Sequence, residues 1–67
     1  MMQNLQVTDL QAIVANRSAA GDQYISRNDV HKNTGCHVEY AFNRLVDMGT
    51  LIKEVVPNTG AIRYKIA

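Results

Sequence analysis

A stretch near the middle of the chain carries side chains that suit contact with nucleic acid. Tyr40, Asn43 and Arg44 follow one another at helical spacing. Arginine can read guanine through two donors, asparagine can bind adenine through two hydrogen bonds, and a tyrosine hydroxyl can bind a phosphate oxygen. Glu39 can accept a hydrogen bond from the amino group of cytosine, although its charge also repels phosphates. This chemistry would suit contact with a nucleic acid, and a simple solvated helix face is the competing interpretation of the same residues.

The residues just before this stretch raise the question of a metal site or a nucleophile. His31, Cys36 and His37 carry imidazole and thiol groups, which are zinc ligands, but they lack a fourth ligand and a known ligand spacing. Cys36 and His37 are adjacent, so their side chains diverge and do not form a nucleophile and base pair. The sequence has no glycine-rich phosphate loop, paired carboxylates or serine motif. We therefore expect no metal, no cofactor and no enzymatic activity.

Length and composition favour one small folded domain, residues 1–67, with an ordered core over about 8–66. The 67 residues are 46% hydrophobic and 19% charged, as in compact proteins. Seven lysines and arginines against six acids leave a net charge of +1. A charge this close to zero does not by itself favour a nucleic-acid partner. The one cysteine cannot form a disulfide within the chain, and no stretch resembles a leader or a membrane span. We expect a cytoplasmic protein without a membrane partner.

Local signals predict two helices in the first half of the chain. Thr8, followed by Gln11, forms a capping-box pattern that predicts a helix over residues 9–20, which Gly21 ends. Ser26, followed by Asp29, predicts a short helix over residues 27–33. Residues 22–25 between them can pair as a strand of two or three residues.

The second half predicts a longer helix and a hairpin. Residues 35–48 have an apolar stripe at helical spacing, with Thr34 as N-cap and Gly49 at the end. Residues 51–56 and 61–66 alternate as strands, and the intervening turn has proline early and a glycine late that suits a left-handed conformation. Tyr64 is expected under the hairpin. The predicted core consists of Leu10, Ile13, Val14, Val30, Val38, Phe42, Leu45, Leu51 and Ile62.

The order of these elements defines an α+β fold, a winged helix-turn-helix of three helices with a C-terminal hairpin. The pattern consists of Thr34, Val38, Ala41, Phe42, Leu45, Gly49, Leu51, Ile52, Gly60 and Tyr64. It resembles the winged-helix DNA-binding domain of bacterial MarR-type regulators. In size the chain resembles still more the small fimbrial-operon regulators of the PapI and FaeA kind. The similarity extends over about residues 8–66.

The resemblance implies a transcriptional regulator that binds specific double-stranded DNA sequences, of phage, plasmid or fimbrial-operon type. The helix at 35–48 would lie in the major groove, and the hairpin at 51–66 would contact the backbone or minor groove. The residues implied to contact DNA are Arg27, Lys32, Thr34, Cys36, His37, Tyr40, Asn43, Arg44, Asn58, Arg63 and Lys65.

Charge leaves a second function open. The helix at 35–48 contains one arginine and two acids, so most phosphate contacts must come from its neighbours. A second copy or another regulatory protein would then assist DNA binding. Alternatively, the fold is a protein-interaction module that modulates a polymerase or regulator. On the hairpin, an ion pair between Glu54 and Arg63 or Lys65 competes with phosphate contact.

Overall fold

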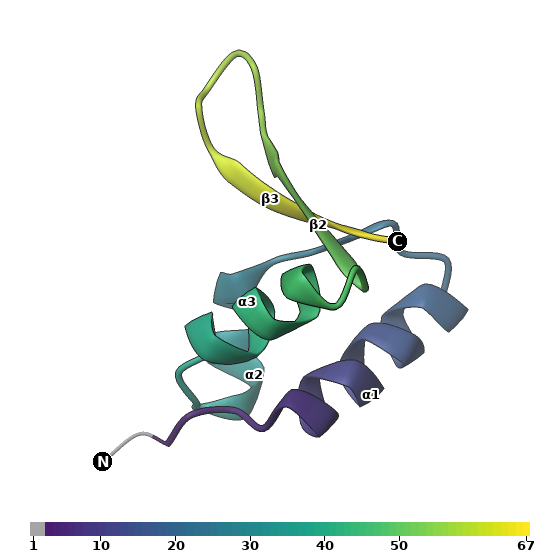
Figure 1. Cartoon of the computed structure of the whole chain (residues 1–67), viewed down its shortest axis with the longest axis vertical. Coiled ribbons are helices and arrows are strands. Elements are labelled where there is room, and N and C mark those ends of the chain that lie inside the picture. The colour runs from purple at the N-terminus through teal and green to yellow at the C-terminus, as the bar shows by residue number, and fades with distance from the viewer. Residues whose placement is uncertain (1–2) are drawn as a thin grey trace.

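The computed structural model describes residues 3–67 and folds them into a helical body with a projecting hairpin. The elements are α1 (Val7–Ala19), β1 (Tyr24–Ile25), α2 (Arg27–Thr34), α3 (Glu39–Asp47), β2 (Leu51–Val55) and β3 (Ile62–Ile66). Figure 1 shows the helices gathered at one end, with the β2–β3 hairpin standing away from them. Over residues 3–67 the predicted α+β class is therefore confirmed, in an arrangement compatible with a winged helix-turn-helix.

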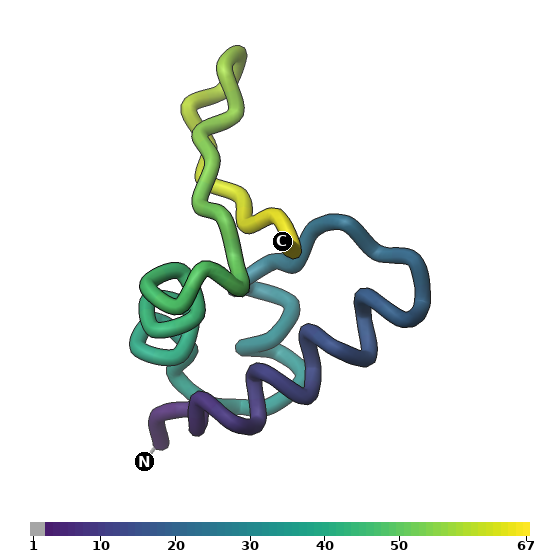
Figure 2. Tube along the Cα trace, turned by 45° about the vertical axis from the view of Figure 1, so that its right-hand side comes forward, coloured from purple at the N-terminus to yellow at the C-terminus, as the bar shows by residue number. Residues whose placement is uncertain are grey.

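The sheet has the strand order β1-β3-β2 and is antiparallel. The predicted short strand before the second helix is confirmed, and it pairs Tyr24 with Lys65 and Ile25 with Tyr64. Because β1 contains only two residues, it covers only the part of β3 near the helices. The rest of the hairpin is a two-stranded ribbon, which explains why it projects so far in Figure 2.

The hairpin turn over residues 57–60 is also confirmed. The amide of Gly60 donates to the Val56 carbonyl at 2.8 Å, and Gly60 has the predicted left-handed backbone with a φ of +69°. Each strand is one residue shorter than predicted on the side of the turn.

The first helix does not begin where its capping signal predicted. It starts at Val7, its N-cap is Gln6, and no side chain caps it. The reason is a contact from a distant segment: the amide of Leu5 donates to the His37 carbonyl at 2.8 Å, and the amide of His37 donates to the Gln3 carbonyl at 2.9 Å. Leu5 is buried, so this docked segment sets the point where the chain enters the helix.

The third helix is shorter than the predicted 35–48, and Thr34 is not its N-cap. Thr34 is the last residue of α2, and Gly35 ends that helix with a left-handed φ of +68°. Residues 36–38 then lead to α3, which starts at Glu39. A threonine and glycine pair can begin one helix or end another, and here the pairing of His37 with the N-terminal segment keeps the next residues out of a helix.

The core lies between the helices and the inner face of the sheet. The rings of Phe42 and Tyr64 meet edge to face with centres 4.8 Å apart, which confirms the predicted position of Tyr64 under the hairpin. Ile13 is only partly buried, and Ile62 is 41% exposed, so its prediction as a core residue was wrong. Ile62 shares a face with Tyr64 but pairs with Val55 at the turn end of the hairpin, outside the buried cluster. The predicted core residues that are confirmed as buried are Leu10, Val14, Val30, Val38, Phe42, Leu45 and Leu51.

Candidate nucleic-acid interface

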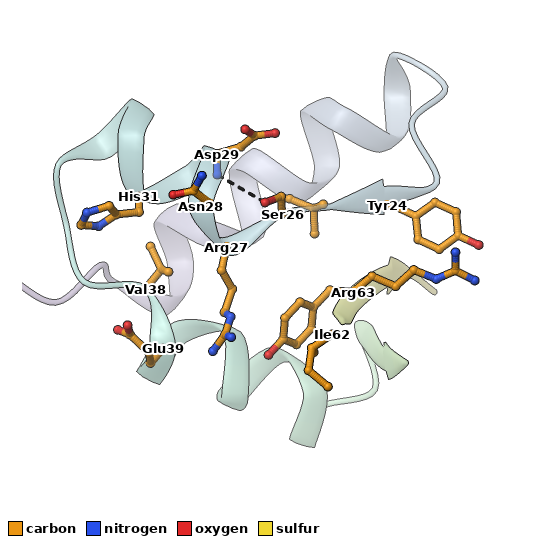
Figure 3. Close-up of a pocket in the computed structure, with 12 residues that line it drawn as sticks. Tyr24, Ser26, Arg27, Asn28, Asp29, His31, Val38, Glu39, Ile62 and Arg63 are labelled. Carbon is orange, nitrogen blue, oxygen red and sulfur yellow. Dashed lines mark hydrogen bonds between the residues drawn. The ribbon is translucent and has the colours of Figure 1, made fainter. Parts of the chain in front are cut away.

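The N-terminal ends of α2 and α3 and the strand β3 enclose an open pocket of about 650 Å³. Figure 3 shows Arg27 and Glu39 together at one end of this pocket, and Arg63 beside Tyr24 at the other. Two cations therefore lie on either side of a concave surface that also contains the carboxylates of Asp29 and Glu39. The lining residues are Tyr24, Ile25, Ser26, Arg27, Asn28, Asp29, His31, Val38, Glu39, Ile62, Arg63 and Tyr64.

The start of α2 is fixed by the cap that the sequence predicted. The Ser26 hydroxyl accepts a hydrogen bond from the amide of Asp29 at 3.4 Å. Arg27, the first residue of the helix, reaches over the ring of Tyr64, with its guanidinium carbon 5.7 Å from the ring centre. This contact orients the Arg27 guanidinium across the pocket toward the sheet.

The guanidinium of Arg63 is held on the outer face of the hairpin. Its Nε donates to Glu54 Oε1 at 3.0 Å, and its guanidinium carbon lies 4.5 Å from the ring centre of Tyr24. The structure therefore contains the ion pair between Glu54 and Arg63, which the sequence had offered as an alternative to phosphate contact by Arg63. The Arg63 side chain is still 45% exposed, so a phosphate can reach it but must compete with the carboxylate.

The exposed surface of α3 divides into two sides. Glu39 lines the pocket near α2 and β3, whereas Tyr40 lines a separate hollow beside residues 4–8. Residues four apart share a helix face, so Asn43 extends the side of Glu39, and Arg44 extends the side of Tyr40. All four side chains are exposed. The predicted groove contacts therefore face two directions.

Glu39 remains ionised to lower pH than an ordinary glutamate. Its own backbone N–H at the start of α3 is the main cause of the lowered pKa, and the nearby charges of His37 and Arg27 add to it. Loss of hydration acts in the opposite direction and is a larger effect on the pKa than either of these charges. The carboxylate is fully exposed and is therefore charged and accessible at neutral pH.

The turn between α2 and α3 uses several predicted contact residues to hold its own shape. The Thr34 hydroxyl donates to the Val30 carbonyl at 2.7 Å and accepts from the Cys36 amide at 3.2 Å. The Nδ1 atom of His31 lies 2.8 Å from the Cys36 carbonyl oxygen, which closes the turn from the other side. A phosphate contact by the Thr34 hydroxyl would have to displace its bond to Val30. The Cys36 thiol is partly buried against the core, and the backbone of His37 pairs with the N-terminal segment.

The remaining predicted contacts lie farther from the pocket. Lys32 is exposed in the last turn of α2, and Asn58 is exposed in the hairpin turn. Lys65 shares the outer sheet face with Arg63 and pairs with Ile52. Their contact with DNA stays a prediction.

Three residues that line the pocket were not among the contacts predicted from the sequence: Tyr24, Ser26 and Asn28. The Ser26 cap was a usable signal, because it marks a helix start, where unpaired amides gather. Tyr24 gave no such signal, because its contact with Arg63 depends on the pairing of β1 with β3. Across residues 3–67, no three His, Cys, Asp or Glu side chains gather as ligands for a metal ion.

Comparisons of the chain with protein-family models, with curated proteins and with solved structures found no match. Among the helices in residues 3–67, none has the length and apolar character needed to cross a bilayer.

Proposed function

We propose that the protein is a winged helix-turn-helix regulator that binds specific sequences of double-stranded DNA, with α3 in the major groove. The observation that carries this proposal is the pocket described above. It places the start of α2, the start of α3 and the hairpin strand β3 around one concave surface with Arg27 and Arg63 on opposite sides. A duplex seated there would have phosphates near the Arg27 guanidinium and base edges near α3, with the Arg63 guanidinium at the rim, on the outer face of the hairpin.

Charge distribution makes this proposal compatible with the net charge of +1. Arg27, Arg44, Arg63 and Lys65 are all exposed and belong to α2, α3 and β3. If these four cations neutralise four phosphates, the logarithm of affinity falls with the logarithm of salt concentration at a slope of about −3.6. Binding by one chain is then weak and sensitive to salt, and a second copy or another regulatory protein would strengthen it.

Fluorescence anisotropy with labelled random duplex at about 50 mM salt tests the proposal. Arg27→Gln should weaken binding to all sequences and make the salt slope shallower by about 0.9, the loss of one phosphate contact. Arg17→Gln is the matched control, because Arg17 lies in the last turn of α1 and does not line the pocket. Absence of binding to any duplex at low salt would overturn the proposal.

A second candidate function is a protein-interaction module. Val55 and Ile62 favour it: they pair across the hairpin on one face and are 61% and 41% exposed. An exposed apolar pair on a projecting ribbon suits contact with another protein. Under this alternative, Val55→Ser would abolish capture of a polymerase subunit or regulator while Arg27→Gln left that capture unchanged.

A further inference from the structure

The observed start of α3 determines which side chains stand at its leading end. In helix-turn-helix proteins, the N-terminal residues of the second helix are the ones that reach base edges. With α3 beginning at Glu39, the residues at this end are Glu39, Tyr40 and Asn43, whereas Cys36 and His37 belong to the turn. Tyr40 lies beside the N-terminal segment, and of these three residues only Glu39 lines the pocket.

The carboxylate of Glu39 is accessible to a ligand, although it already interacts with the backbone N–H at the start of α3. It is fully exposed, and in residues 3–67 no salt bridge joins it to another side chain. An ionised carboxylate accepts hydrogen bonds and donates none. In the major groove, cytosine and adenine each present an amino donor, which in adenine lies beside the N7 acceptor, whereas guanine presents only acceptors at its N7 and O6 atoms and so repels a carboxylate.

Arg27 and Glu39 are neighbours with opposite charges, so they suit different parts of a duplex. Arg27 lies beside Glu39 in the pocket and can bind the DNA backbone, while the acid itself repels phosphates. A duplex that places no amino donor opposite Glu39 removes water from the carboxylate without a new hydrogen bond in return, which weakens binding. The acid on α3 therefore disfavours non-specific binding and favours a matching base.

We propose that Glu39 is a specificity-determining residue, which accepts a hydrogen bond from the amino group of a cytosine in the major groove. Asn43, one helical turn farther along the same side, reads a neighbouring base, with adenine as the base that matches its amide. This inference rests on the proposed DNA-binding function and assigns the base class that the site selects.

Selection of bound sequences from random duplex DNA with the full chain tests the assignment. The wild type should enrich cytosine at one position, and Glu39→Gln should change the preferred base there toward adenine, because a glutamine amide binds adenine. The ratio of affinity for the wild-type site to affinity for random duplex measures specificity. In Glu39→Gln this ratio should be at least about fivefold lower than in the wild type, the effect of one lost base contact.

Asp47→Asn is the matched control. Asp47 is the other acid of α3, is exposed, and lies at the opposite end of the helix. Both substitutions remove one negative charge, so both should raise affinity for random duplex. Only Glu39→Gln should alter the base preference at a defined position. Circular dichroism spectra that match the wild type establish that both variants are folded.

The outcomes separate this inference from the function on which it rests. A wild-type chain that binds no duplex overturns both. A wild-type chain that selects a site, while Glu39→Gln and Asp47→Asn leave the same base preferences, overturns the inference and keeps the DNA-binding function. Enrichment of an A·T pair rather than a C·G pair at the position sensitive to Glu39 also overturns it.

Discussion

Arg63 and Glu54 face each other across the hairpin and form an ion pair with an Nε to Oε1 distance of 3.0 Å. The two residues are direct partners in the register of β2 and β3, so strand pairing brings their side chains together on the outer face. The pair fixes the position of one cation that is proposed to contact phosphate, and it also lowers the positive charge available there.

Glu54→Gln should therefore strengthen binding to DNA. The substitution removes the carboxylate that competes for Arg63, so affinity for random duplex at low salt should rise, as measured by fluorescence anisotropy. Stability should change by less than about 1 kcal/mol, because the pair is exposed to solvent. Unchanged affinity would mean that Arg63 does not contact the duplex.

Tyr64 carries a buried hydroxyl with no hydrogen-bond partner among the described residues. Such a group costs about 1 to 3 kcal/mol, so Tyr64→Phe should leave the free energy of unfolding unchanged or raise it by about 1 kcal/mol. Tyr64→Ala should lower it by about 3 to 5 kcal/mol through loss of the packed ring. Urea denaturation measures both values, and a marked loss of stability in Tyr64→Phe would reveal a partner for the hydroxyl.

Thr34 should matter for folding and little for contact with phosphate. Thr34→Val removes the hydroxyl that bonds the Val30 carbonyl and the Cys36 amide, and should lower the free energy of unfolding by about 1 to 2 kcal/mol. Thr34→Ser keeps the hydroxyl and should lose less. Affinity for random duplex should match the wild type in both variants, and a loss of affinity in folded Thr34→Val that Thr34→Ser does not share would indicate a phosphate contact instead.

The titration of Glu39 should be visible by NMR. Its pKa in the folded protein should lie below the ordinary value of 4.5, because the start of α3 favours the charged form. A lowered pKa means that Glu39 contributes stability above pH 4.5, and that this contribution is lost as the pH falls through the folded-state pKa. Glu39→Gln should lack this part of the acid dependence of unfolding, and a folded-state pKa at or above 4.5 would contradict the expected position of the carboxylate.

The sequence predicted those parts of the fold whose signals are local or periodic. Phe42 and Leu45 repeat at helical spacing and are buried, and Gly60 supplies the left-handed residue of the hairpin turn. Ser26 caps α2 as its spacing with Asp29 indicated. In each case, residues close together in the chain carry the information.

The start of α3 depended on a contact that no local pattern contains. Thr34 and Gly35 fit the beginning of one helix and the end of another equally well. The pairing of His37 with residues 3–5 decides between these alternatives, and sequence spacing gives no sign of it. For the site, helix geometry alone separates the adjacent Asn43 and Arg44 by about 100°, but which neighbours each one faces depends on how α3 packs beside the N-terminal segment and the sheet.

The docking of the N-terminal segment beside the α2–α3 turn also has a consequence for folding kinetics. Leu5 and His37 are far apart in the chain, so the hydrogen bond between them closes a long loop. The entropic cost of closing this loop is offset only after the helices have packed. This pairing should therefore form late and open first. In native-state hydrogen exchange, the amides of Leu5 and His37 should exchange by local opening well before the amide of Leu45 in the middle of α3.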